Sequence, residues 1–114
     1  MGKYNGWKRI SALTKSASAT LTKAESGCLI IADTDAITLT LPPAADSAGV
    51  HYTIKVTATH SSGVAVDGNA SETIDGTVTM TSNAQYGVLE IVCDGSAWHA
   101  LNQGDNTDAI WTKT

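Results

Sequence analysis

Two carboxylates three positions apart stand in the segment "ETIDG", at Glu72 and Asp75. Acids at this spacing could act as an acid and a base, or as ligands of a cation. A calcium loop, however, alternates oxygen ligands over about twelve residues and ends in a bidentate acid, and Thr73 and Ile74 interrupt that pattern. A glycosidase pair lies in a sugar-binding cleft, and only 5% of the residues are aromatic and could line one. The alternative is a type I′ turn between strands, in which Gly76 accepts positive φ without steric cost. We expect Asp75 and Gly76 to form that turn.

The other acids that stand beside glycine or beside each other have the same two interpretations. Asp33 and Asp35 could share a cation, but we expect them to cap the turn before Ile37. Asx side chains bond nearby backbone amides and favour turns. The remaining residues predicted to form structural turns are Asp67, Gly68, Asp94 and Gly95.

The histidines and cysteines carry no recognisable catalytic or metal spacing. His51, His60 and His99 are far apart in the sequence; a zinc site from His51 and His99 is the alternative to exposed histidines on sheet faces. Cys28 and Cys93 lie in apolar runs and are expected to be small buried side chains, with a disulfide between facing strands as the alternative. No G-x-S-x-G or phosphate-binding glycine motif occurs. We therefore predict no catalytic residue, no metal, no cofactor and no enzymatic activity.

The elements that would position these residues read as short strands. No stretch keeps a helical apolar stripe for three turns, whereas residues 36–41, "AITLTL", and 50–59, "VHYTIKVTAT", alternate apolar and polar side chains. Pro42-Pro43 ends the first of these strands, because proline cannot donate to a ladder. About eight such strands fit between residues 27 and 101. The sequence predicts an all-β protein, an antiparallel β-sandwich, jelly roll or barrel.

The two ends of the chain differ from the middle. Residues 1–23 carry five cations and no acid, whereas residues 24–114 carry two cations and eleven acids. We expect residues 1–26 to form a basic N-terminal arm, extended or with one weak strand, residues 27–102 to form the domain, and residues 103–114 to form a tail. Trp111 in that tail needs shelter, on its own domain or in a neighbour. The cations are too sparse to predict nucleic-acid binding, and no membrane span or signal peptide is visible.

The middle of the chain resembles a β-rich module of bacteriophage virion proteins, found in tail fibres, tail spikes and capsid-surface proteins. The segments that carry the resemblance are "CLIIADTDAITLTLPPAADSAGVHYTIKVT", "VAVDGNASETIDG" and "YGVLEIVCDGSAWHAL", within residues 28–101. The order and spacing of these segments are more specific than any one of them. The resemblance implies a structural β-sandwich that is usually trimeric and has no catalytic activity.

The module with two short tails is most similar to a capsid decoration, or cement, protein. That resemblance implies a homotrimer on the outer surface of the virion, bound to the major capsid protein. The residues expected to bind the capsid mix cations with aromatic anchors: Lys3, Tyr4, Trp7, Lys8 and Arg9. The alternative function is a tail-fibre or surface-knob module that binds a host receptor or a glycan.

Overall fold

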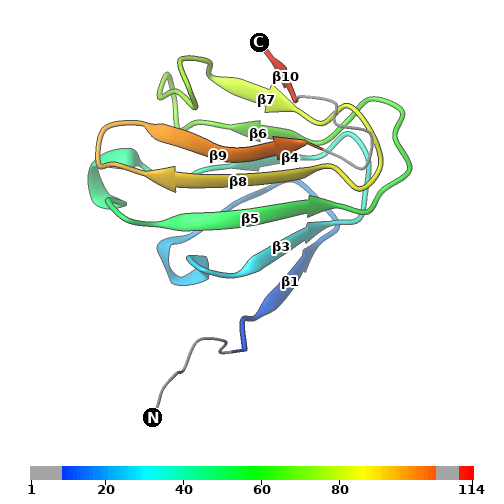
Figure 1. Ribbon diagram of the computed structural model, residues 1–114, viewed down its shortest axis with the longest axis horizontal. Coiled ribbons are helices and arrows are strands. Elements are labelled where there is room, and N and C mark those ends of the chain that lie inside the picture. Colours follow the sequence, from blue (N-terminus) through cyan, green and yellow to red (C-terminus); the bar gives the residue numbers. More distant parts are fainter. Residues whose placement is uncertain (1–8, 105–110) are drawn as a thin grey trace.

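Ten β-strands and two 3₁₀ helices make up residues 9–104 and 111–114, the part of the chain that this computed structural model describes. Sheet A has the strand order β1-β3-β5-β8-β9, and sheet B has the order β10-β7-β6-β4-β2. In Figure 1 the strands of sheet A lie side by side from β9 to β1. The strands are β1 (Ala12–Lys15), β2 (Ala19–Thr20), β3 (Leu29–Ala32), β4 (Thr38–Thr40), β5 (His51–Val56), β6 (Ala65–Asp67), β7 (Thr79–Thr81), β8 (Val88–Cys93), β9 (Trp98–Gly104) and β10 (Thr112–Lys113), and the helices are η1 (Lys23–Glu25) and η2 (Ala44–Asp46).

The all-β prediction is confirmed, and the alternation of side chains along the strands explains the core. Ile37, Leu39 and Leu41 are buried, whereas Thr38 and Thr40 between them are only half-buried. Successive side chains of a strand point to opposite faces of its sheet, so one face of each strand enters the core. The same alternation in β5 and β8 buries Tyr52, Ile54, Val56, Leu89, Ile91 and Cys93. Inward side chains of both sheets form one hydrophobic cluster.

The pairing of the strands corrects the predicted antiparallel arrangement, because both sheets are mixed. Strands β1, β3 and β5 are parallel neighbours, as are β2, β4 and β6. From β1 to β6 the chain alternates between the two sheets, so strands two apart in sequence lie side by side and run the same way. Antiparallel pairs are β5 with β8, β8 with β9, β6 with β7, and β7 with β10.

Seven of the ten strands, β3 to β9, begin between residues 27 and 101, where about eight were predicted, and the other three lie at the two ends. Strands β1 and β2 and helix η1 lie within the segment predicted to be an arm, and each of the two strands forms one edge of a sheet. Strand β9 extends into the predicted tail, and β10 lies in it. Trp111 is 2% exposed and belongs to the chain's own core. No helix among the described residues is long and apolar enough to cross a membrane.

The outward faces of the two sheets differ in chemistry. On sheet B the register aligns threonines in two rows across the strands. One row is Thr20, Thr40, Asp67 and Thr79, and the next is Thr38, Ala65, Thr81 and Thr112. On sheet A the outward positions are mixed: Leu29 and Ile31 on β3 stand beside Thr53 and Lys55 on β5, and Val88 and Val92 on β8 flank Glu90. Sheet B therefore presents mostly hydroxyl groups to its surroundings, and sheet A presents aliphatic, polar and charged side chains together.

Candidate functional site

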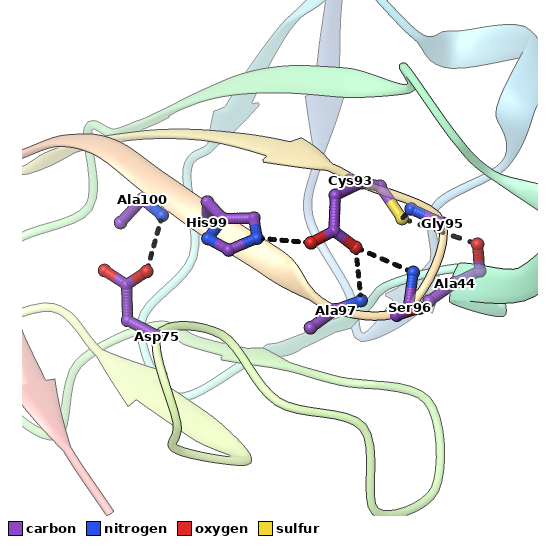
Figure 2. Close-up of polar contacts among 9 residues, drawn as sticks. Ala44, Asp75, Cys93, Gly95, Ser96, Ala97, His99 and Ala100 are labelled. Atoms are coloured by element: carbon purple, nitrogen blue, oxygen red, sulfur yellow. Dashed lines mark hydrogen bonds and ion pairs between the residues drawn. The ribbon is translucent and has the colours of Figure 1, made fainter.

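The carboxylates of Glu72 and Asp75 bind different parts of the fold. Glu72 Oε1 accepts the backbone N–H of Ala44 at the start of η2 at 3.0 Å. Asp75 Oδ1 accepts the backbone N–H of Ala100 in β9 at 3.2 Å, as Figure 2 shows. Each acid thus joins a loop to a neighbouring element, and the two do not converge on a common ligand.

The backbone around Asp75 and Gly76 has the geometry of a tight two-residue hairpin loop. Asp75 has φ 49° and Gly76 has φ 83°. Ile74 and Thr77 exchange backbone hydrogen bonds of 2.6 and 3.0 Å. Positive φ at both central residues is the signature of a type I′ turn. A non-glycine residue at the first of these positions is most often Asn or Asp, and Asp75 is such a residue.

The carboxylate of Asp94 organises the loop between β8 and β9. It accepts the backbone N–H groups of Ser96 and Ala97 at 2.7 and 2.9 Å. Its other oxygen forms a hydrogen bond with His99 Nε2 at 2.7 Å. In Figure 2 dashed lines run from His99 and from the backbone nitrogens of Ser96 and Ala97 to the unlabelled carboxylate that lies between them. The His99 hydrogen bond and then the two amides lower the pKa of Asp94 to about 2, so the acid is ionised and holds the loop.

Asp35 binds a turn that lies far from it in sequence, whereas we had predicted a cap for its own turn. Its two carboxylate oxygens accept the backbone N–H groups of Ser61, Ser62 and Gly63 at 3.3, 2.8 and 2.9 Å. Such successive amides form a concave anion site, which this side chain fills. The Ser62 and Gly63 amides hold the pKa of Asp35 below its ordinary value of 3.8. Asp33 binds only the hydroxyl of Thr34.

Replacing Asp35 by asparagine is expected to destabilise the protein at neutral pH, because charge-assisted bonds to three amides are lost. A carboxyl whose folded pKa is depressed contributes stability above its unfolded pKa, and that contribution disappears as the pH falls through the folded value. The difference in melting temperature between wild type and Asp35→Asn should therefore be largest near neutral pH and shrink below about pH 4. Thermal unfolding followed by circular dichroism across this pH range measures it.

The control for this experiment is Asp33→Asn, a matched change two residues away at an exposed acid with one hydroxyl partner. It should leave the melting temperature nearly unchanged at every pH. Equal effects of the two substitutions would contradict the structural role assigned to Asp35.

Asp67 is the last residue of β6, and Gly68 follows it where the chain packs closely against the backbone of Glu72. Asp67 Oδ1 accepts the hydroxyl of Thr79 on the neighbouring strand at 2.6 Å. A Cβ atom on Gly68 would lie 2.1 Å from the carbonyl oxygen of Glu72. The glycine is therefore required by space, since its φ is not positive.

The three histidines do not converge on a metal site. His51, Val92 and His99 lie in one row across β5, β8 and β9. The two histidines are separated by two strand spacings, roughly 10 Å, which is too far for a shared ion. Among the residues that the structure describes, no three His, Cys, Asp or Glu side chains are grouped so that they could hold a metal ion.

Both cysteines are free thiols. Cys93 is buried, as predicted, and Cys28 is half-buried. The backbones of Cys28 and Cys93 bond opposite sides of β5, at Thr53 and Val50. Strands two apart in a sheet are separated by roughly 10 Å, beyond the reach of about 7 Å between the Cα atoms of a disulfide. Burial raises the pKa of the Cys93 thiol, which keeps it protonated and unreactive.

The predicted capsid-binding arm falls mostly outside the described part of the chain. Lys3, Tyr4, Trp7 and Lys8 lie outside residues 9–104 and 111–114, and Arg9 is exposed just before β1. An ion pair of 2.8 Å joins Lys15 in β1 to Glu25 in η1, and it was not predicted from the sequence. The signal that could have revealed it is T-x-x-E, an N-terminal capping pattern.

That pattern appears at Thr22, whose backbone N–H donates to Glu25 Oε1 at 2.9 Å. Burial alone would raise the pKa of Glu25, but the hydrogen bonds from Lys15 and Thr22 lower it overall. Glu25 therefore holds η1 to β1 as an ionised side chain. Two of the cations predicted to belong to a basic arm, Lys15 and Lys23, are thus part of the body of the fold.

Exposed apolar side chains are the remaining candidates, and they lie at separate places in or beside strands of sheet A. The large hydrophobic residues that are exposed in the described part of the chain are Ile10 (64%), Tyr86 (44%) and Leu101 (71%). Ile10 precedes β1, Tyr86 precedes β8, and Leu101 lies in β9, all strands of sheet A. Large exposed apolar patches on folded proteins mark interaction surfaces.

The fold places this chain among all-β proteins built from two mixed five-stranded sheets. Several of its acids bind backbone at turns, and its large exposed apolar residues lie in or beside strands of sheet A. No protein-family model, no curated protein and no solved structure matches the chain.

Proposed function

We propose that this chain is a β-sandwich of jelly-roll type that serves as a capsid decoration protein of a bacteriophage. In this proposal it is a non-catalytic homotrimer that binds the major capsid protein on the outer surface of the virion and stabilises the shell. The resemblance of residues 28–101 to virion modules supports the phage assignment. The mixed five-stranded sheets around one hydrophobic cluster are compatible with a sandwich.

The observation that carries the proposal is that the acidic side chains hold the backbone of the fold in place. Asp35, Asp75 and Asp94 each accept backbone N–H groups of a turn or strand. Ile10 before β1 and Leu101 in β9, in contrast, expose most of their apolar side chains. Acids that hold turns, together with exposed apolar side chains, suit a protein that binds other proteins.

Binding to the shell is assigned to the basic arm, with Lys3, Tyr4, Trp7, Lys8 and Arg9 as its contact residues. Tyr and Trp serve as anchors at protein interfaces, and Arg pairs with carboxylates in a bidentate manner. These residues fit an acidic, partly apolar groove between capsid subunits. A trimer presents three arms, and linked weak contacts raise the total avidity by orders of magnitude. The bound trimer would clamp neighbouring subunits against the pressure of the packaged DNA.

Reversing the charge of the arm tests this assignment. The variant Lys3→Glu, Lys8→Glu, Arg9→Glu should lose most of its occupancy on undecorated capsids, because it replaces attraction to an acidic groove by repulsion. Quantitative gel analysis of sedimented particles measures the occupancy. Binding of the wild type should also weaken as salt is added, since exposed charges are screened.

The matched control is Lys23→Glu, Lys113→Glu, which reverses two exposed cations that are not among the five proposed contact residues. It should bind particles nearly as well as the wild type. Undiminished occupancy of the arm variant would refute the arm assignment. Binding of the purified protein to host cells or glycans, with no affinity for capsids, would instead support a tail-fibre or surface-knob module.

A further inference from the structure

Six strands of the fold form a stack that is open at one side. From β1 to β6 the chain alternates between the two sheets, and β3 to β6 each run parallel to the strand two before them. The last two strands of the stack, β5 and β6, pair with the antiparallel strands β8 and β7. The first two, β1 and β2, are edges of their sheets, and Figure 1 shows β1 at the margin beside β3. We call the margin formed by β1 and β2 the open side.

The backbone of β1 presents hydrogen-bonding groups at the open side. The carbonyl groups of Ser11 and Lys15 accept N–H groups from β3 and from the residue after it. Backbone groups alternate in direction along a strand, so those of Ala12 and Thr14 point away from β3. Within residues 9–104 and 111–114, β1 pairs with no strand other than β3. Such an edge can pair with a strand of another molecule.

An ion pair stands on the inward side of this edge. In the parallel ladder Leu13 is beside Ile30 and Lys15 is beside Ala32. Ile30 and Ala32 are fully buried, and neighbouring residues of a ladder point to the same face, so Lys15 also points to the core side of sheet A. Its ammonium group meets the Glu25 carboxylate at 2.8 Å, and the two side chains are 20% and 18% exposed. Two charges therefore lie where the neighbouring strand contributes apolar side chains.

The Glu25 carboxylate connects the edges of the two sheets. Its second oxygen accepts the backbone N–H of Thr22, two residues after β2. The pair thus extends from β1 in sheet A to the segment that follows β2 in sheet B. Strand β2 has two residues, and Ser18 before it accepts the N–H of Thr38 with its hydroxyl oxygen. The four-residue β1 is therefore the longer of the two open edges.

Stability alone does not explain a charged pair at this position. Taking two charges out of water has a desolvation cost, and apolar replacements of buried pairs often leave stability unchanged or raise it. An inward-pointing charge on an edge strand, in contrast, opposes pairing with another chain. A strand added there would remove the remaining water from the charge, and a desolvated charge is unfavourable.

We propose that the Lys15–Glu25 pair covers the open side and prevents copies of this chain from adding to the stack edge to edge. A strand that pairs with the outward groups of β1 must lie against this pair and desolvate it. The pair therefore keeps the parallel stack at its own length. The inference is independent of the proposed function, because it concerns only the behaviour of the purified chain.

Removing both charges tests the inference. Lys15→Met with Glu25→Gln keeps the length of both side chains and an acceptor for the N–H of Thr22. In sedimentation equilibrium of the full chain, the weight-average mass of this double variant should rise with concentration to roughly twice the wild-type value or more, since an uncovered edge templates pairing. A second double variant, Lys15→Gln with Glu25→Gln, keeps a hydrogen bond at the pair and should associate in the same way. Circular dichroism establishes that each variant is folded.

The matched control makes the same changes on central strands. Lys55→Met with Glu90→Gln alters β5 and β8, each of which pairs with a strand on both sides, and it leaves the net charge as unchanged as the first double variant does. It should associate no more than the wild type. Equal association of the control and the first double variant would overturn the inference, because the effect would then come from the loss of charge at any position.

A proline in β1 distinguishes edge pairing from other association. Thr14→Pro removes an N–H that points to the open side, and proline is tolerated in an edge strand. Added to the double variant of Lys15 and Glu25, it should return the weight-average mass to the wild-type value. Hydrogen exchange measured by nuclear magnetic resonance gives a second readout, since the Ala12 and Thr14 amides should become protected when the double variant associates.

Three results would contradict the role assigned to the pair. The first is a folded double variant that sediments as the wild type does at every concentration. The second is association that Thr14→Pro does not reverse. The third is protection of the Ala12 and Thr14 amides in the wild type that increases with concentration, because the open side would then already join copies of the chain.

Discussion

Replacing Trp98 by alanine is expected to lower the free energy of unfolding by about 3–5 kcal/mol. Its side chain is fully buried, and its ring stacks on Tyr52 with centroids 5.8 Å apart. Its backbone also accepts from Asp75 and donates to Thr73, which ties the 72–77 hairpin to β9. Since small domains are stable by only about 5–15 kcal/mol, this loss is a large part of the total. Urea denaturation followed by far-ultraviolet circular dichroism measures it.

The matched control is Trp98→Phe, which keeps an aromatic ring beside Tyr52. The indole Nε1 of Trp98 is buried and has no hydrogen-bond partner among residues 9–104 and 111–114, and an unsatisfied buried donor costs free energy. Phenylalanine removes that donor, so it should cost about 1–2 kcal/mol, well below the loss from alanine. A loss of less than about 1 kcal/mol for Trp98→Ala would contradict the central position of this side chain.

Gly68→Ala is expected to lower the free energy of unfolding by about 3 kcal/mol. The added Cβ atom would lie 2.1 Å from the carbonyl oxygen and 2.8 Å from the carbonyl carbon of Glu72. Backbone atoms cannot rotate away as a flexible side chain can, so the loop before the 72–77 hairpin must move. That shift would also weaken the hydrogen bond that the backbone N–H of Ala44 donates to the Glu72 carboxylate. The unfolding midpoint in urea provides the measurement.

Gly49→Ala serves as the control, because it tests backbone conformation without a collision. Gly49 has φ 84°, and no atom lies within 4 Å of a Cβ placed there. Only the left-handed conformation is then penalised, at about 1–2 kcal/mol. If Gly68→Ala and Gly49→Ala lowered the free energy of unfolding equally, steric contact would not explain why position 68 requires glycine.

Local patterns were sufficient to predict the strands and their inward faces. The alternation in "AITLTL" identified Ile37, Leu39 and Leu41 as core residues, and all three are buried. Trp111 was expected to need shelter, and the structure places it in the core of its own chain. These features follow from neighbouring residues, since a strand has a side-chain period of two wherever it pairs.

The candidate site was less accessible to such patterns. Asp35 was expected to act locally, yet it binds amides of residues 61–63. Leu101 appeared to be one more residue of a strand, and a bulge set by the register of β8 and β9 leaves it 71% exposed. Neither the contact of Asp35 with residues 61–63 nor the bulge at Leu101 can be predicted from patterns of neighbouring residues.

The sequence by itself determined that this chain forms short strands with one apolar side each, because that property depends on side chains next to one another. Only the tertiary structure decided that β1, β3 and β5 run parallel, and that Glu72 and Asp75 bind different elements of the fold. The physical reason is that pairing partners, strand direction and register are selected by burial summed over the whole core. Segments far apart in sequence contribute to that sum, and many pairings satisfy the same local alternation.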